Sequence, residues 1–119
     1  MDHDCTVRIT MEYLSKKWAI MILLELYKGE QEWKRFTQIR DTMKEITPKV
    51  LSERLKELEK EELIIRNVDA TSFPVKSEYK LTEMGVELVE AVKEIKNWAL
   101  KWKVINHACK EQDCRICIL

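Results

Sequence analysis

The clearest hydrophobic pattern along the chain lies in residues 46–65. Three leucines recur there at i, i+4 and i+7, the spacing of one buried stripe on a helix. Thr47 suits an N-cap and Pro48 the first helical position, where a missing N–H costs nothing. The stripe contains Leu51, Leu55 and Leu58, and the opposite face carries Lys49, Glu53, Lys56 and Lys60 with Ser52 at its flank. Such a polar face is ordinarily just solvated, so the neighbouring elements decide its meaning.

A second pattern turns this helix into part of a motif. Residues 37–43 form a candidate short helix, capped by Thr37, with Ile39 and Met43 on its buried side. A turn of about three residues separates it from Thr47, which is the spacing of a helix-turn-helix. In that motif the first helix braces the second across a nucleic-acid backbone.

A β-hairpin is expected directly after the second helix. Residues 63–65 are apolar, residues 66–76 are polar and residues 77–81 alternate again, as in two short strands around a loop. A helix-turn-helix followed by such a hairpin is a winged helix, so the fold class is mainly α with a small β-hairpin wing. Arg66 and Lys76 then lie where they can contact phosphates, which add affinity but no sequence information.

The N-terminal third of the chain is expected to supply core helices. Residues 5–13 predict an arm or short helix, and residues 15–27, capped by Ser15, predict a helix that is apolar around most of its circumference. Gly29 ends this helix as a C-cap would. The expected stripe contains Trp18, Ile22 and Leu26, widened by Met21 and Leu24.

A long helix is expected at the C-terminal end, capped by Thr82. Its apolar stripe contains Leu88, Val92, Ile95, Ala99 and Trp102, joined by Val89 and Trp98. The stripe is longer than so small a core can cover, which favours burial against a second copy and dimerisation through the terminal helices. The alternative is that the helix folds back onto Trp18 and Ile22 of its own subunit.

Composition narrows the functional classes. With 119 residues, 45% of them hydrophobic, the chain suits one domain. Its 21 basic and 21 acidic residues cancel, so a basic footprint requires local segregation. The longest apolar run, residues 18–24, is far shorter than the roughly 20 residues that span a bilayer. No signal-peptide pattern precedes it. We therefore expect a cytoplasmic protein without a membrane partner. His3 and His107 show no nucleophile-base spacing, which argues against an enzyme.

The end of the chain gathers residue types that bind metals or react with oxidants: His107, Cys109, Cys114 and Cys117. The cysteine spacing C-x4-C-x2-C occurs in plant-type iron-sulfur proteins, where Cys5 or a partner's cysteine would supply the fourth ligand. Including His107 instead gives a tetrahedral zinc set. A thiol-disulfide switch between Cys5 and the tail, and a tail of free reduced thiols, are the other interpretations.

Several motifs follow one another in a characteristic order. They are Lys17-Trp18, residues 22–26, Phe36 with Ile39, the run ITPKVL at 46–51 with Leu55, Leu58 and Glu59, the run LIIR at 63–66, and Pro74 followed by EYKLT at 78–82 and Gly85. With these motifs the chain resembles the HxlR-type winged helix-turn-helix transcriptional regulators, related in architecture to MarR-like regulators, from about residue 5 to 98. Cys5 matches a position where many relatives carry a redox-sensing thiol, and Arg8 one turn away would favour the thiolate if the arm is helical.

This resemblance implies a homodimeric bacterial or archaeal regulator that binds double-stranded DNA. It divides the chain into a winged-helix domain at residues 1–98 and an extension of the dimerisation helix with a Cys-rich tail at 99–119. The expected DNA contacts are Thr47, Pro48, Lys49, Ser52, Glu53, Lys56, Arg66 and Lys76. The expected dimer contacts are Leu88, Val92, Ile95, Trp98 and Trp102.

Two departures from the family pattern keep other functions open. Glu62 stands where the family usually has Gly after the recognition helix, so it must bear left-handed strain or end the helix differently. Glu53 would repel phosphate unless it accepts a hydrogen bond from a cytosine amino group. A winged helix used only for protein contacts and a zinc- or iron-sulfur-responsive regulator are therefore the alternative functions.

Overall fold

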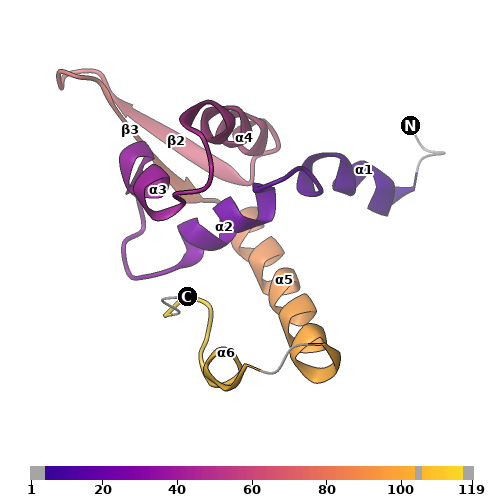
Figure 1. The fold of residues 1–119 in the computed structure, drawn as a ribbon. Coiled ribbons are helices and arrows are strands. Elements are labelled where there is room, and N and C mark those ends of the chain that lie inside the picture. The colour runs from indigo at the N-terminus through magenta and orange to yellow at the C-terminus, as the bar shows by residue number, and fades with distance from the viewer. Residues whose placement is uncertain (1–4, 104–105, 117–119) are drawn as a thin grey trace.

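A computed structural model describes residues 5–103 and 106–116 of the chain. Figure 1 shows a body of short helices and a small sheet, from which α1, the hairpin and the second half of α5 project. The elements are α1 (Thr6–Leu14), α2 (Ala19–Tyr27), β1 (Lys34–Arg35), α3 (Phe36–Thr42), α4 (Pro48–Lys60), β2 (Ile64–Asp69), β3 (Lys76–Leu81), α5 (Glu83–Trp102) and α6 (His107–Glu111). The predicted fold class is confirmed. None of the helices in these two ranges is both long enough and apolar enough to cross a bilayer.

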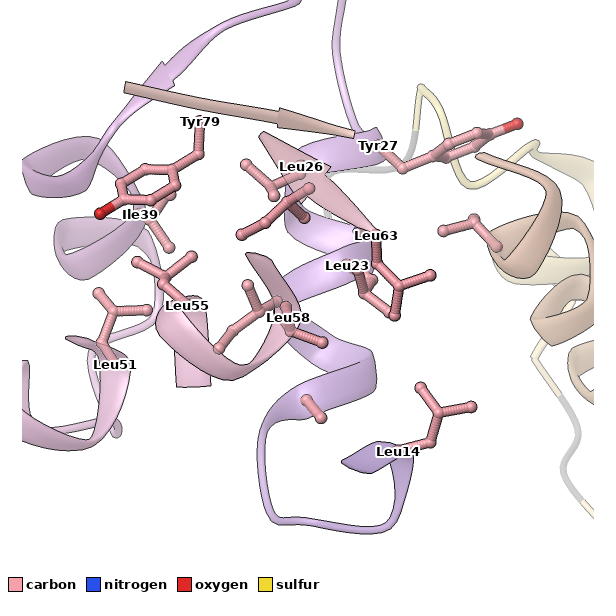
Figure 2. Close-up of a cluster of buried hydrophobic side chains, with 14 of the residues drawn as sticks. Leu14, Leu23, Leu26, Tyr27, Ile39, Leu51, Leu55, Leu58, Leu63 and Tyr79 are labelled. Carbon is pink, nitrogen blue, oxygen red and sulfur yellow. The ribbon is translucent and has the colours of Figure 1, made fainter. Parts of the chain in front are cut away.

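One apolar core joins α2, α3, α4 and the sheet (Figure 2). Its most deeply buried side chains are Ile22, Leu23, Ile39, Leu51, Leu55, Leu58, Ile64 and Val89. The set includes all three leucines of the stripe predicted on α4. Truncating one such side chain to alanine typically costs about 2 to 5 kcal/mol, so these contacts fix the orientation of α4 and leave its polar face outward.

The two helices of the helix-turn-helix begin in different ways. The start of α4 is as predicted, because the Thr47 hydroxyl oxygen accepts a backbone hydrogen bond 3.2 Å long and Pro48 follows. The start predicted for α3 at Thr37 is wrong by one residue. Arg35 takes the N-cap position, and its backbone N–H donates to the Gln38 side-chain oxygen at 2.9 Å. The amide of Gln38 therefore does the capping that Thr37 was expected to do.

The helix predicted over residues 15–27 is wrong at its start. It begins at Ala19, and Ser15 instead ends α1, where its hydroxyl donates to a carbonyl of that helix. Between them Trp18 adopts a left-handed conformation with φ of 79°, which breaks the helix although its side chain packs partly against the core. Met21 does not widen the buried stripe, because half of its side chain is exposed.

The sheet has three antiparallel strands in the order β1-β3-β2. The predicted hairpin is present with longer strands, paired from Ile64 opposite Leu81 to Asp69 opposite Lys76. The third strand, β1, was missed because two residues carry no readable periodicity. It anchors the segment before α3 to the middle of β3, so the wing and the helix-turn-helix form one unit.

The long helix α5 is buried only in its first half. Val89 is fully buried against the core, whereas Ile95, Trp98 and Trp102 are 61%, 56% and 66% exposed. The fold-back alternative thus accounts for the first two turns and leaves the rest of the stripe uncovered by the described chain.

Gly85 is expected to tolerate no side chain. A Cβ built there lies 2.2 Å from the Leu63 carbonyl oxygen, a backbone atom that cannot move without displacing the start of β2. We expect Gly85→Ala to lower the free energy of unfolding by about 2 kcal/mol, because overpacking outweighs the gain in helix propensity of roughly 1 kcal/mol. Urea denaturation measures this, with Asn97→Ala on the exposed part of α5 as the control that should be neutral or slightly stabilising. Equal stabilities of Gly85→Ala and the parent would contradict the packing described.

Candidate nucleic-acid interface

The helix α4 is fixed against the turn between α1 and α2 by polar contacts as well as by the core. The Arg54 guanidinium donates to the Lys17 carbonyl oxygen at 2.9 Å and pairs with Glu57 at 3.4 Å. Glu57 also pairs with Lys16 at 3.1 Å. Because these contacts lie on the inner flank of α4, they hold the helix without using its outer face.

The outer face of α4 presents hydrogen-bonding groups at its N-terminal end. Thr47, Lys49, Glu53 and Lys56 are exposed, as is Pro48, while Ser52 is half-buried. Within the described part of the chain, no ion pair involves any of these groups. The face is therefore free to meet base edges and phosphates, and it mixes two cations with one anion, as the sequence indicated.

The hairpin formed by β2 and β3, called the wing below, carries fewer free cations than its sequence suggests. Arg66 donates to the Ser77 hydroxyl at 2.9 Å across the strands. Lys80 pairs with Glu32 at 3.2 Å and lies over the Trp33 ring. Lys76, near the tip, is exposed. Of the predicted phosphate contacts, Lys76 is free and Arg66 is shared with its cross-strand neighbour.

Two further cations border this surface that the sequence analysis did not single out. Arg35 is exposed and lines, with Lys76 and Pro74, a cleft of about 370 Å³ between α3 and the wing. Lys44 is exposed in the turn between α3 and α4. The helix-turn-helix motif itself is the signal that could have found them, since its turn and the start of its first helix lie near the backbone of a bound duplex.

The terminal helices expose a second surface, which is apolar. On α5 it comprises the exposed residues Ile95, Trp98 and Trp102, and Leu88 and Val92 of the predicted stripe are half-buried. On α1 the exposed apolar residues are Val7, Ile9 and Met11. Exposed apolar side chains that share one face of a helix, as Ile95, Trp98 and Trp102 do, are typical of a protein interface.

The tail after α5 folds back against α5 and α2. The Lys93 ammonium pairs with Asp113 at 3.0 Å and donates to the Tyr27 phenol oxygen at 2.6 Å. Burial lowers the pKa of Lys93, but the hydrogen bonds to Tyr27 and Asp113 outweigh burial and raise it overall. Arg115 lies over the Tyr27 ring, 4.2 Å from its centroid. The tail is thus held by charge and aromatic contacts, on a face of α5 other than the exposed stripe.

The cysteines are dispersed. Cys5 is exposed at the start of α1, and Cys109 and Cys114 are half-buried, all as free thiols. Figure 1 shows α1 and α6 on different sides of the molecule, so a disulfide from Cys5 to the tail of the same chain would require a large rearrangement. Within residues 5–103 and 106–116, no three metal-ligating side chains gather, and Cys117 lies outside the described residues.

Comparison with known sequences gives one family match and several similar relatives. Residues 13–107 match the family described as HxlR-like helix-turn-helix. The chain is 40% identical over 92 residues to the uncharacterized HTH-type transcriptional regulator YvaP of Bacillus subtilis, covering 77% of this chain and 82% of YvaP. It is 42% identical over 86 residues to the HTH-type transcriptional regulator YodB of the same bacterium, covering 72% of this chain and 73% of YodB.

Comparison with solved structures also finds transcriptional regulators. The reduced form of YodB superimposes with a TM-score of 0.71 at 36% identity, covering 87% of this chain and 98% of that one. YodB has also been solved bound to a quinone and after treatment with diamide. The redox regulator HypR in its oxidized form superimposes with a TM-score of 0.69 at 31% identity, covering 85% of this chain and all of that one.

Proposed function

Since the chain belongs to the HxlR-like helix-turn-helix family, we propose that it is a sequence-specific DNA-binding transcriptional regulator that acts as a homodimer in the cytoplasm. The observation that carries the proposal is the outer face of α4, where Lys49, Glu53 and Lys56 are exposed without ion-pair partners on a helix that its inner flank holds in place. In helix-turn-helix proteins this N-terminal end contacts base edges in the major groove.

We propose different roles for the positively and negatively charged residues of α4. Lys49 and Lys56 suit a guanine edge or a phosphate, and Glu53 suits the amino group of cytosine. Thr47 and Pro48 fix where the helix begins, and Arg66, Lys76 and Arg35 supply contacts to phosphates beside it. Because few cations are free, we expect modest affinity and strong dependence on the second half-site.

Selection of bound duplexes from a random pool, at two salt concentrations, tests the proposal. The parent chain should enrich a two-fold symmetric sequence, and its affinity for that sequence should fall steeply as salt rises. Enrichment of no sequence, with no salt-dependent binding, would leave the alternative of a winged helix used only for protein contacts.

The dimer is proposed to form through α5 and α1. The exposed residues Ile95, Trp98 and Trp102 lie in a stripe that a symmetric second copy would bury, and α1 offers further exposed apolar side chains. A two-fold dimer places one α4 on each half-site, which is the arrangement that makes palindromic operators.

Regulation by oxidants or electrophiles is proposed to act through Cys5. Its thiol is exposed at the start of α1, one of the helices proposed to form the dimer, so modification there can change the separation of the two copies of α4. Similar proteins solved in reduced, quinone-bound and oxidized forms support regulation of this kind, and the choice of Cys5 rests on its exposure. The tail cysteines of a second copy are the proposed partners.

Diamide treatment of anaerobically purified protein tests the role of Cys5. We expect the oxidized parent chain to bind its selected duplex about 10 to 100 times more weakly, a coupling of the usual size, and Cys5→Ser to be insensitive. Bound zinc and iron are measured on the same sample, which tests the metal-responsive alternative. Sensitivity that persists in Cys5→Ser would move the sensor to Cys109, Cys114 and Cys117.

A further inference from the structure

The tail after α6 forms one wall of an open cavity. The cavity has a volume of about 770 Å³, within the range of roughly 300 to 1,000 Å³ that small-molecule sites occupy. Its other walls are the outer side of α2 and the turn between α3 and α4. The tail residues that line it, Arg115 and Ile116, lie outside residues 13–107, which match the family. The cavity thus depends on a segment that the family pattern does not include.

Hydrogen bonds hold this part of the tail in place. The Gly29 backbone N–H donates to the Arg115 carbonyl oxygen, which joins the tail to the end of α2. The Lys96 ammonium of α5 donates to the Gln112 carbonyl oxygen at 2.9 Å, and the ion pair of Lys93 described above adds a third contact. Figure 1 shows the tail returning from α6 toward the body, on the side of α2. The wall that the tail forms is therefore fixed at several points.

The apolar side chains that line the cavity are mostly flexible. Met21 is 50% exposed and Ile116 is 67% exposed, while Trp18 and Met43 are half-buried. Methionine has three rotatable bonds and adapts its shape to what it contacts. Trp18 also has the left-handed backbone noted above, a kind of strain that is common at ligand sites. This lining suits a flexible alkyl chain.

Cationic side chains outnumber carboxylates around the cavity. The charged residues that line it are Lys28, Lys34, Lys44 and Arg115, with Glu25 and Glu45. Among residues 5–103 and 106–116, none of these six forms an ion pair. The cavity therefore has an excess of positive charge that an anionic ligand would offset.

Lys34 is the cation best placed to bind an anion. Its ammonium is partly buried, where it donates to the Glu25 carbonyl oxygen and to the Lys28 carbonyl oxygen at 2.7 Å. These two hydrogen bonds fix the group and leave its third N–H available. Burial is the main cause that lowers the pKa of Lys34, so an anion beside this ammonium would stabilise its charged form.

We infer that the cavity binds a medium-chain alkyl carboxylate, with the carboxylate at Lys34 and the chain against Met21, and that the bound ligand weakens binding to DNA. The last step rests on the proposed function. Lys44 lines the cavity and also borders the proposed DNA-binding surface. A negative charge in the cavity reduces the attraction between this lysine and a DNA phosphate.

Calorimetry of the full chain without DNA tests the site directly. Decanoate should bind once per subunit and about ten times more tightly than octanoate, because two more CH₂ groups are buried. Decanol has the same chain without the charge, so it should bind about ten times more weakly than decanoate, the loss expected for a charge-assisted contact. Decanol binding as tight as that of decanoate would overturn the assignment of a carboxylate.

Two comparisons between variants locate the ligand. Met21→Ser should bind decanoate about ten times more weakly, whereas Met84→Ser should bind it as the parent chain does, because Met84 is equally exposed but does not line the cavity. Lys34→Met should weaken decanoate binding about tenfold and leave decanol binding unchanged, which a general loss of structure would not do. Lys28→Met gives the same comparison if the Lys34 variant fails to fold. Equal decanoate affinities in the two methionine variants would overturn the site.

Titration of the selected duplex with and without saturating decanoate tests the effect on DNA binding. Decanoate should weaken binding by the parent chain about fivefold, a coupling of ordinary size, and should have less than half that effect on Lys44→Gln. Met21→Ser should be insensitive at the same decanoate concentration. Unchanged duplex affinity of the parent chain at saturating decanoate would overturn the regulatory role. A parent chain that binds no duplex would overturn the proposed function, whereas calorimetry would still decide whether the site exists.

Discussion

Ile95→Glu is expected to turn the protein into a monomer at micromolar concentration and to weaken its binding to a two-half-site duplex by about 100-fold or more. The Ile95 side chain is 61% exposed in one subunit, within the apolar stripe of α5, so a second copy would surround it. A carboxylate there would be buried without a partner, which the interface cannot accommodate. Losing the second half-site removes the gain from linked binding, which is typically 10² to 10⁴ in affinity. Light scattering and a binding titration measure the two effects.

Asn97→Glu is the matched control for this substitution. It adds the same charge two residues further along α5, on the opposite side of the helix and at an exposed position. It should leave both the mass and the affinity unchanged. A parent chain that is already monomeric, or an Ile95→Glu variant that stays dimeric, would show that the stripe is not the interface.

The double variant Lys49→Ala/Lys56→Ala is expected to bind the selected duplex much more weakly than the parent chain. Both ammonium groups lie on the outer face of α4 without ion-pair partners in the described chain. Each base or phosphate contact of this kind typically contributes about 1 to 3 kcal/mol, so the pair should cost at least about 2 kcal/mol, or roughly thirtyfold in affinity. The single variants separate the roles, since a base contact changes the preference at one position and a phosphate contact weakens all sequences alike.

Lys103→Ala/Lys110→Ala removes the same charge from the other end of the molecule. Both lysines are exposed, one at the end of α5 and one in α6, away from α4 in Figure 1. Its affinity should fall only slightly, through the smaller long-range attraction. Equal losses in the two double variants would mean that net charge, and not the face of α4, binds the DNA.

Local chemistry made much of the fold predictable. Thr47 with Pro48 and Thr82 mark helix starts that the structure confirms. Such starts are predictable because the capping hydroxyl and the backbone N–H that donates to it are only three residues apart in the sequence. Of the two alternatives left open for Glu62, left-handed strain or a different helix end, the structure has the first, with φ of 63°. It is held there by its neighbours, since its carbonyl oxygen accepts from the Thr82 hydroxyl at 2.7 Å.

The features that sequence reasoning missed depend on residues far apart along the chain. Trp18 breaks a helix without a glycine or proline, in a turn whose Lys17 carbonyl is bonded by Arg54 of α4. The tail was expected to be a metal ligand set, a switch or free thiols. Its packing rests on Lys93 with Asp113 and on other contacts to α2 that no local pattern announces.

The sequence predicted which side chains are exposed where helical periodicity defines a face, and it missed exposed side chains elsewhere. The outward set on α4 follows from counting turns of a helix, so Lys49, Glu53 and Lys56 were found. Arg35 was not singled out, because its position beside the wing depends on the pairing of β1 with β3, which no local pattern announces. Phe73 was not singled out either, because the complete exposure of this apolar side chain cannot be read from the sequence of a predicted loop.

Methylation protection on the selected duplex tests the central claim most directly. Dimethyl sulfate modifies guanine N7 in the major groove, where α4 of each subunit is proposed to lie. A homodimer should protect two patches whose centres are one helical turn, about 10 base pairs, or a multiple of that apart, on one face of the duplex. Protection of a single patch at saturating protein, or of none while binding persists, would contradict the account.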